Sequence, residues 1–183
     1  MPPDVKRAII ETMEALQRTV VVPSLRWVRP EGIHATLDFL GATSEDRVPA
    51  IKQALAGCAE TVAPFELTPL DIGWFGGRNV RVIWIGLGGD DGALAGLAER
   101  VEEALEPLGF PREQQAFNAH LTLARVHGDA SPADRVRLYE ALKRFDAPRF
   151  PTFRATEFVL MQSILGPGGA RYRPQATFAL SGE

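Results

Sequence analysis

The stretch HATL at residues 34–37 recurs as HLTL at residues 120–123, and this repeat decides the fold. Residues 33–40 alternate and are rich in residues that fit a pleated strand, and Gly41 ends this stretch. In a strand, residues i and i+2 lie on one face, so each histidine shares a face with its threonine. The alternate residues are apolar in both copies, and we expect them to point to an opposite face that helices cover.

The same order of elements surrounds both copies of the motif. A histidine-containing strand, a helix, a strand, a glycine-rich turn and a strand run from 34 to 87, and again from 120 to 180. This repeat predicts one bilobed domain over residues 1–183, an α+β fold with a pseudo-two-fold duplication. Each lobe is expected to be a mostly antiparallel sheet with helices on its outer face. Two such lobes facing each other would present both histidines and both threonines to a central cleft.

Hydrophobic periodicity and turn residues predict the individual elements. Helices are expected over 4–19, from 44 through 58, over 91–108, and after the Ser131-Pro132 pair that suits a helix start. Strands are expected over 33–40, 65–75, 80–87, 120–125, 155–165 and 171–180. Trp27 and Phe39 are expected to pack in the core.

Composition limits the classes of function. A chain of 183 residues suits one sizeable globular domain. A single cysteine excludes an intramolecular disulfide and favours a cytoplasmic protein, and with three histidines it is too few for the usual structural zinc sites. The sequence contains no run of 18 consecutive apolar residues, so no membrane-spanning helix is expected. A net charge of −3 argues against a broad basic surface for duplex nucleic acid, and a monomer is expected.

Two imidazoles and two hydroxyls suit proton transfer at a phosphate. Histidine gives or takes a proton near neutral pH, so two facing histidines can act as base and acid on opposite sides of one centre. Threonine hydroxyls can donate hydrogen bonds to anionic oxygens as charge develops. The pattern favours in-line displacement at a phosphodiester, in which one histidine activates water and the other protonates the leaving alkoxide. This chemistry requires neither a metal nor a cofactor.

The residues around both motifs resemble the two-histidine phosphoesterases, and above all their RNA 2',3'-cyclic phosphodiesterase branch, the LigT-like 2'-5' RNA ligase group. The resemblance rests on Trp27, Glu31, HATL followed by FLG at 39–41, FNAHLTLAR at 117–125, and the tail from 163 to 180. It implies hydrolysis of RNA 2',3'-cyclic phosphate ends to a 2'-phosphate, and weak reversible 2'-5' ligation in some members. The expected partners are therefore RNA ends or cyclic nucleotides.

The resemblance also implies a role for each residue of the motifs. His120 would be the base that activates water, and His34 the acid that protonates the departing 3' oxygen. Thr36 and Thr122 would bind the phosphate oxygens, and Arg125 would add positive charge beside them. Arg125 is five residues from His120 and so out of phase with its face. We therefore expect it to reach the site only if the strand ends or bulges there.

Two other classes of function fit the same motifs. One is a non-catalytic module that binds nucleotides or RNA ends in the same cleft. The other is a two-histidine metal hydrolase, which needs carboxylate ligands near the histidines. Only Asp38 has a suitable phase for this role, and Asp38 is better explained as a solvent-exposed carboxylate at the end of a strand. His127 is expected to be a solvated loop residue. Phe75, Arg78 and Tyr172 lie near predicted turns, where they could stack on a base or hold a second phosphate.

Overall fold

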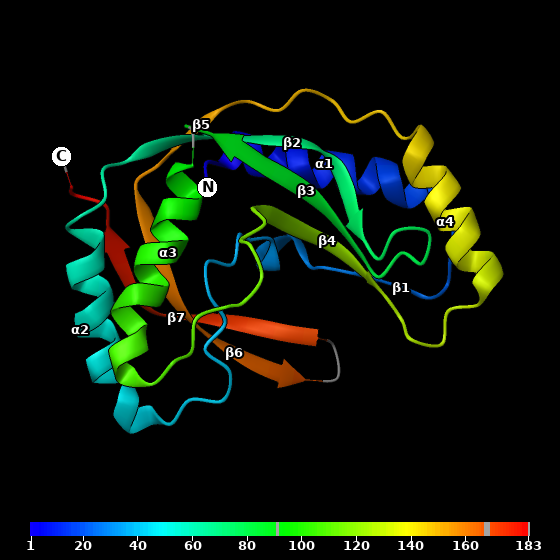
Figure 1. Ribbon diagram of the computed structural model, residues 1–183. Helices are drawn as coiled ribbons and strands as arrows, with labels where there is room; N and C mark the ends of the chain where they lie inside the picture. The colour runs from blue at the N-terminus through cyan, green and yellow to red at the C-terminus, as the bar shows by residue number, and fades with distance from the viewer. Residues whose placement is uncertain (91, 167–168, 183) are drawn as a thin grey trace. The chain divides into compact units, whose positions relative to one another are not determined.

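The structure, a computed structural model, describes residues 1–90, 92–166 and 169–182. Within them the chain is an α+β protein with helices and antiparallel sheets, which confirms the predicted fold class (Figure 1). In chain order the elements are α1 (Pro3–Thr19), β1 (Leu25–Trp27), η1 (Pro30–Gly32), η2 (Glu45–Arg47), α2 (Val48–Ala59), β2 (Phe65–Phe75), β3 (Val82–Gly89), α3 (Ala93–Leu105), η3 (Glu106–Leu108), β4 (His120–Val126), α4 (Pro132–Arg144), β5 (Phe153–Ala155), β6 (Glu157–Gly166) and β7 (Gly169–Ala179).

The chain divides into two compact units, each made of three separate segments. The first unit is Met1–Ala35, Thr68–Gly88 and His120–Phe153, and the second is Thr36–Leu67, Gly89–Ala119 and Arg154–Glu183. Each unit therefore takes residues from both halves of the sequence repeat. The first unit contains His34, His120, Thr122 and Arg125, whereas Thr36 is the first residue of the second unit.

Strand β4 holds the first unit together because it pairs on both of its edges. The five-stranded sheet has the order β1-β4-β3-β2-β5, and β4 is antiparallel to both β1 and β3. On β3, Trp84 lies opposite Thr122 and Gly86 lies opposite His120. The register then shifts by one residue between Ile83 and Trp84, so β4 carries a β-bulge.

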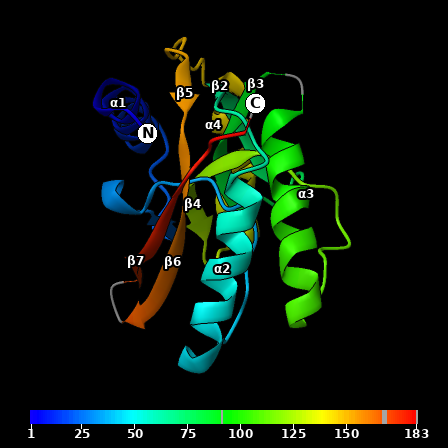
Figure 2. The ribbon, with the colours of Figure 1, turned by 90° about the vertical axis from the view of Figure 1, so that its left-hand side faces the viewer.

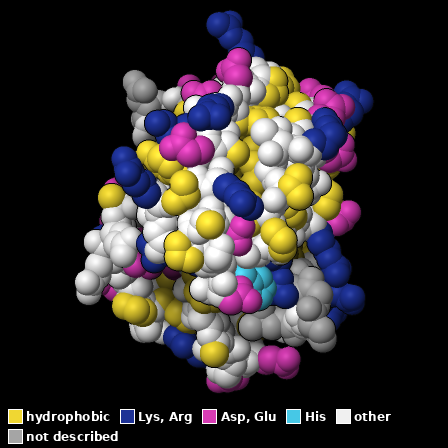
Figure 3. All heavy atoms as spheres, turned by 90° about the vertical axis from the view of Figure 1, so that its right-hand side faces the viewer, with side chains coloured by type: hydrophobic (Ala, Val, Ile, Leu, Met, Phe, Trp, Pro, Cys, Tyr) yellow, Lys and Arg dark blue, Asp and Glu magenta, His cyan; other side chains and the backbone are white. Residues whose placement is uncertain are grey.

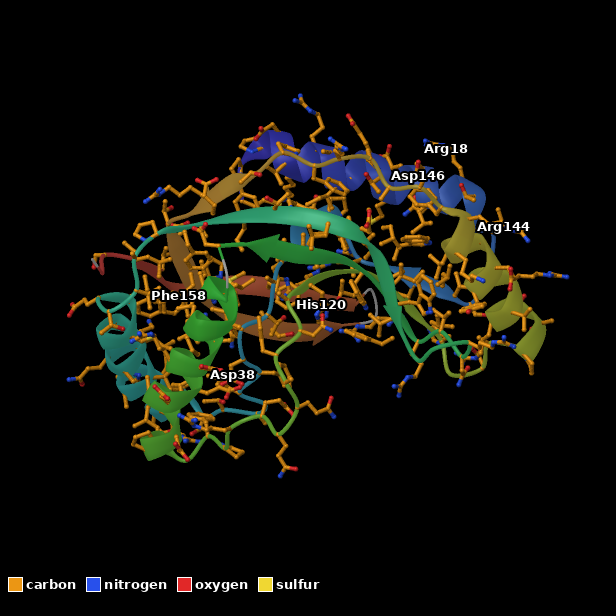
Figure 4. All side chains as sticks on the ribbon, turned by 45° about the horizontal axis from the view of Figure 1, so that its top comes forward. Arg18, Asp38, His120, Arg144, Asp146 and Phe158 are labelled. Carbon is orange, nitrogen blue, oxygen red and sulfur yellow. The ribbon has the colours of Figure 1, made fainter. Side chains whose placement is uncertain are left out.

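Helices α1 and α4 and the sheet together supply the apolar core of the first unit. Both helices belong to that unit, and α1 runs along the strands in Figures 1 and 4. The fully or nearly fully buried side chains are Val5, Ile9, Met13 and Leu16 of α1, Leu138 and Leu142 of α4, and Ile83, Ile85, Leu121 and Leu123 of the sheet. Because these strand residues alternate along β3 and β4, the even-numbered residues of β3 lie on the other face.

Helix α4 is fixed at its first turn. The Ser131 hydroxyl accepts a hydrogen bond from the Asp134 backbone N–H at 3.1 Å, as expected for a residue that caps a helix. The Arg135 guanidinium donates to the backbone carbonyls of Val80 at 2.7 Å and His127 at 3.1 Å. A single side chain thus ties α4 to the β2–β3 turn and to the loop after β4.

The second unit combines α2 and α3 with the β6–β7 hairpin. Figure 2 shows the two helices side by side, and they bury Ile51 and Leu55 of α2 and Leu97 and Val101 of α3. In the hairpin, Phe158 lies opposite Phe178, and their ring centroids are 5.1 Å apart. The two rings form an aromatic cluster within the core of this unit.

The predicted helices all form, and most predicted strands do. The helix expected from Ser44 begins as η2 and continues as α2, and Gly109, with a φ of 83°, follows the end of the third helix. The short strands β1 and β5 were not predicted, since three residues carry too little periodicity to be recognised. Of the predicted boundaries, Asp91 before α3 and Pro167-Gly168 between the last strands lie outside the described residues.

The prediction of a strand over 33–40 is wrong. Only Ala35 pairs, in an isolated antiparallel bridge to Leu121. Its partner strand begins at His120, so residues after Thr36 have no strand of β4 left to pair with. The Asp38 carboxylate instead accepts a hydrogen bond from the Phe39 N–H at 2.6 Å. Phe39 is 79% exposed rather than buried, so its assignment to the core is also wrong, and Trp27 is only half-buried.

Charges of both signs are mixed over the face shown in Figure 3, where Lys and Arg are interspersed with Asp and Glu. The net charge of −3 agrees with this distribution. Within the described residues, no helix is long and apolar enough to cross a membrane. No cluster of three or more His, Cys, Asp or Glu side chains in this part of the chain is arranged to hold a metal ion.

Candidate active site

The candidate site of the first unit is organised by one backbone pairing, the bridge between Ala35 and Leu121. These are the residues that follow His34 and His120, so the two histidine motifs pair with each other in antiparallel directions. In such a pairing the residue before Ala35 lies beside the residue after Leu121, which places His34 next to Thr122. Leu121 is 1% exposed, so its neighbours on β4 face away from the core.

The His34 ring is oriented by a local hydrogen bond. Its Nδ1 lies 2.7 Å from the backbone carbonyl oxygen of Gly32. A carbonyl oxygen only accepts hydrogen bonds, so Nδ1 must carry a hydrogen and donate it. Nε2 is then the atom of this ring that gains or loses a proton. The side chain is exposed, and the 3₁₀ turn η1 just before it supplies the carbonyl.

His120 lies at the start of β4 (Figure 4), and two aromatic rings pack against it. The Phe75 ring meets the imidazole edge-on, with centroids 5.1 Å apart, and the Trp84 ring is tilted toward it at 6.1 Å. Phe75 and Trp84 also contact each other, with centroids 5.3 Å apart. The three rings form a connected set that restricts the rotation of the imidazole.

Trp84 takes its position because Gly73 has no side chain. A Cβ atom at Gly73 would lie 2.1 Å from Cη2 and 2.3 Å from Cζ2 of the Trp84 ring. Carbon atoms in ordinary contact are about 3.5–4.0 Å apart, so no other residue fits here without moving the indole. Gly73 therefore supports His120 indirectly, through the ring that packs beside it.

The bulge in β4 brings Arg125 to the same face as His120. On β3, Val82, Trp84 and Gly86 alternate regularly and so share one face. Their partners on β4 are Arg125, Thr122 and His120 in that order, with Leu123 as the extra residue. Residues directly opposite each other share a face, so the bulge restores the phase that spacing alone had denied to Arg125. The sequence predicted that Arg125 would reach the site only if this strand ends or bulges, and the strand does contain a bulge.

Thr36 and Asp38 belong to the second unit. The role of Thr36 stays a prediction that rests on its place two residues after His34. Asp38 is half-buried, and burial is the main cause that raises the pKa of its carboxyl group, with Glu113 adding to the rise and the Phe39 N–H opposing it. The description of Asp38 as a solvent carboxylate therefore needs correction.

The remaining residues singled out from the sequence lie on different elements of the fold. His127 is an exposed loop residue, as predicted, with its Nδ1 3.7 Å from an Asp129 carboxylate oxygen. Arg78 lies in the β2–β3 turn and lines a shallow cavity of about 320 Å³ beside α4. Tyr172 lies on β7 in the second unit, opposite Ser163. Of these residues, Phe75 packs against His120.

Sequence reasoning missed Gly73, Trp84 and Arg26 as residues of this site. Trp84 had a signal, since it alternates with Ile83 and Ile85 and so had to lie on the face opposite the core. Arg26 had none, because its place depends on β1 pairing with β4, where Arg26 lies opposite Arg125.

Comparison with known proteins places the chain in a family. The family model of the 2'-5' RNA ligase superfamily matches residues 2–166. An Archaeoglobus fulgidus protein named RNA 2',3'-cyclic phosphodiesterase is 34% identical over 178 residues, which cover 96% of each chain. A crystal structure of a Thermus thermophilus protein superposes with a TM-score of 0.79 at 25% identity, covering 100% of this chain and 95% of the other. E. coli LigT, crystallised with 3'-AMP, gives 0.73 at 26% identity, covering 99% and 94%. From the match over residues 2–166 and this degree of identity, the chain belongs to the 2'-5' RNA ligase superfamily.

Proposed function

We propose that this protein hydrolyses the 2',3'-cyclic phosphate at RNA ends to a 2'-phosphate. The observation that carries the proposal is the Ala35–Leu121 bridge, which pairs the two histidine motifs directly. Membership of the 2'-5' RNA ligase superfamily and the name of the Archaeoglobus relative support the same substrate. The 3'-AMP bound to LigT supports a nucleotide as the group recognised.

In the proposed reaction His120 is the base and His34 is the acid. A water oxygen attacks the phosphorus while His120 accepts the proton of that water. The bond from phosphorus to the 3' oxygen breaks, and Nε2 of His34 gives its proton to that oxygen. The Nδ1 hydrogen bond to Gly32 supports this role for His34, because it leaves Nε2 as the atom that transfers the proton.

Thr122, Thr36 and Arg125 are proposed to bind the non-bridging oxygens of the phosphate. Thr122 is supported by its place beside His34, and Arg125 by its place on the face of His120. Hydrogen bonds from a guanidinium or hydroxyl to an oxygen whose charge grows are stronger in the transition state than in the ground state. The same arrangement would accept a 5'-hydroxyl in place of water, so weak 2'-5' ligation accompanies hydrolysis in the proposal.

We also propose that the protein works without a metal ion or cofactor, as a monomer, and in the cytoplasm. The two imidazoles supply both the acid and the base, so the reaction needs no metal ion or cofactor. The protein acts as a monomer, since the two motifs of one chain pair with each other. The single cysteine, Cys58, is a free buried thiol, which favours the cytoplasm as its compartment.

The test measures turnover of 2',3'-cyclic AMP and of a short RNA that ends in a 2',3'-cyclic phosphate, with and without EDTA. We expect 2'-phosphate products, undiminished by EDTA, and a rate that falls at both low and high pH because one histidine must be protonated and the other neutral. His34→Ala and His120→Ala should each lower kcat by about 10²-fold or more, in line with the loss of one general acid or base. His127→Ala, which removes the loop histidine, is the matched control and should keep wild-type activity.

Two results would overturn this proposal. The first is binding of the cyclic nucleotide without turnover by the wild type, which identifies a non-catalytic binding module. The second is activity that EDTA abolishes and a divalent metal restores, which identifies a metal hydrolase. Circular dichroism of both alanine variants confirms that lost activity reflects the missing imidazole.

A further inference from the structure

Arg26 of β1 lies directly opposite Arg125 of β4 in the five-stranded sheet. Both residues are exposed and both belong to the first unit. Residues directly opposite each other on antiparallel strands have Cβ atoms about 5 Å apart, and like charges at such positions are destabilising. Among the residues that the structure describes, neither guanidinium takes part in an ion pair or a side-chain hydrogen bond. This arrangement gains stability once anionic oxygens bind the two guanidinium groups.

The pair lies on the face of the candidate site. Arg125 shares that face with Thr122 and His120 because of the bulge at Leu123. Arg26 is opposite Arg125, so it shares the face as well. Arg26 also lies along the same edge of β4 as His34, because the Ala35–Leu121 bridge places His34 beside Thr122.

The distance of Arg26 from the reacting phosphate and the charge of the arginine pair both indicate that a second phosphate binds at Arg26. The partners of His34 and Arg26 on β4 are Thr122 and Arg125, which lie opposite Trp84 and Val82 of β3 because of the bulge. Two residues of β3 at about 3.3 Å each give a separation of roughly 7 Å. That separation is comparable to the length of one nucleotide. A 2',3'-cyclic phosphate carries a single negative charge, which one of the two arginines already balances. The second arginine is matched by a second phosphodiester in the same strand.

We propose that Arg26 binds the phosphodiester on the 5' side of the terminal nucleotide while the cyclic phosphate reacts at His34 and His120. This inference rests on the proposed function and makes it more specific: the preferred substrate is the end of an RNA strand, and a cyclic mononucleotide lacks one of its contacts. Arg26 is thus a specificity-determining residue. It contacts no reacting atom, and its effect depends on whether the substrate has a second phosphate.

The test compares two substrates, 2',3'-cyclic AMP and a trinucleotide that ends in a 2',3'-cyclic phosphate. In Arg26→Gln, we expect kcat/KM for the trinucleotide to fall roughly tenfold or more, through KM, since a charge-assisted hydrogen bond is lost. The value for 2',3'-cyclic AMP should stay within about twofold. A plot of log kcat/KM against log salt for the trinucleotide should become shallower by about 0.7, as expected for one lost phosphate contact with a single strand.

Arg18→Gln is the matched control, because Arg18 is also an exposed arginine of the first unit but lies on α1 (Figure 4). It removes the same charge and should change neither substrate. Arg26→Gln should also keep or slightly raise Tm, since it relieves a repulsion. Equal effects on both substrates, or no effect on either, would overturn the inference, as would a variant that loses Tm. A wild type inactive on both substrates would instead refute the proposed function.

Discussion

The contact between Gly73 and Trp84 gives the sharpest prediction about how the fold supports the site. In Gly73→Ala, the added methyl group would lie 2.1, 2.3 and 2.4 Å from three atoms of the Trp84 ring. Carbon atoms approach to about 3.5–4.0 Å, so the overlap is about 1.5 Å and spans the six-membered ring. A rigid indole cannot bend away at one end. The whole side chain or strand β2 must therefore move.

The size of the effect follows from overpacking and from the rings beside Trp84. Inserting a methyl group into a filled space costs about 1–3 kcal/mol in the free energy of unfolding. For a chain of this size, that lowers Tm by roughly 2–12 °C. Because Trp84 packs against His120 and Phe75, the shift should also displace the imidazole. A misplacement of about 1 Å at a catalytic group lowers the rate by up to about 10²-fold.

The assays are urea unfolding and turnover of 2',3'-cyclic AMP. Gly57→Ala is the matched control, because Gly57 is an exposed residue inside α2 and an added Cβ there would meet open space. There the same substitution should stabilise the protein by about 0.5–1 kcal/mol, through the higher helix propensity of alanine, and leave turnover unchanged.

A second substitution separates the proposed contact from a general intolerance of alanine at position 73. Trp84→Phe removes the ring atoms that the new methyl group meets, so Gly73→Ala should destabilise this variant much less than it destabilises the wild type. The reasoning is refuted if Gly73→Ala costs the same free energy in both backgrounds, or if it alters neither stability nor turnover in the wild type.

Three further predictions concern the supports of each unit. Arg135→Gln loses hydrogen bonds from a charged group to backbone carbonyls and should lower the free energy of unfolding by roughly 1.5–3 kcal/mol. Arg137→Gln, on the same helix, loses only an exposed ion pair and should change the free energy of unfolding by less than about 1 kcal/mol. Urea titrations of the two variants side by side would refute this if they unfolded alike. Ser131→Ala should lower it by about 1 kcal/mol and Ser131→Asn should not, as thermal melts can show, because asparagine also caps a helix. Asp38→Asn should be more stable than the wild type at pH 7. Burial raises the pKa of the Asp38 carboxyl group in the folded state, so the ionised carboxylate destabilises the folded wild type above that pKa. The stability difference between Asp38→Asn and the wild type should therefore disappear as pH falls toward about 3.9. A difference that does not depend on pH would contradict this explanation.

The residue pattern was sufficient for the helices and for the two motifs. Each helix combines an apolar stripe with a boundary signal, such as Ser131 before α4 or Gly109 after the third helix, and these signals act within a few residues. The relation between the two histidine motifs was also visible, because H-x-T-L occurs twice among only three histidines. Strand phase then predicted that each histidine and its threonine share a face.

The strand expected over 33–40 shows where this reasoning stops. Alternation is a local property, but a strand exists only where another strand is available to pair with it. Here β4 begins at His120, so the pairing ends at Ala35, and Phe39 is left exposed although the pattern placed it in the core. No feature of residues 33–40 by themselves carries that information.

By itself, the sequence determined the α+β class, the approximate boundaries of the helices and the presence of two matching histidine motifs, because all three depend on local periodicity or on repetition. The tertiary structure decided which face Arg125 occupies, since that depends on one extra residue in β4 relative to β3. It also decided that Arg26 meets Arg125 and that Gly73 makes room for Trp84. These contacts join residues that are far apart along the chain, and only the register between strands brings them together.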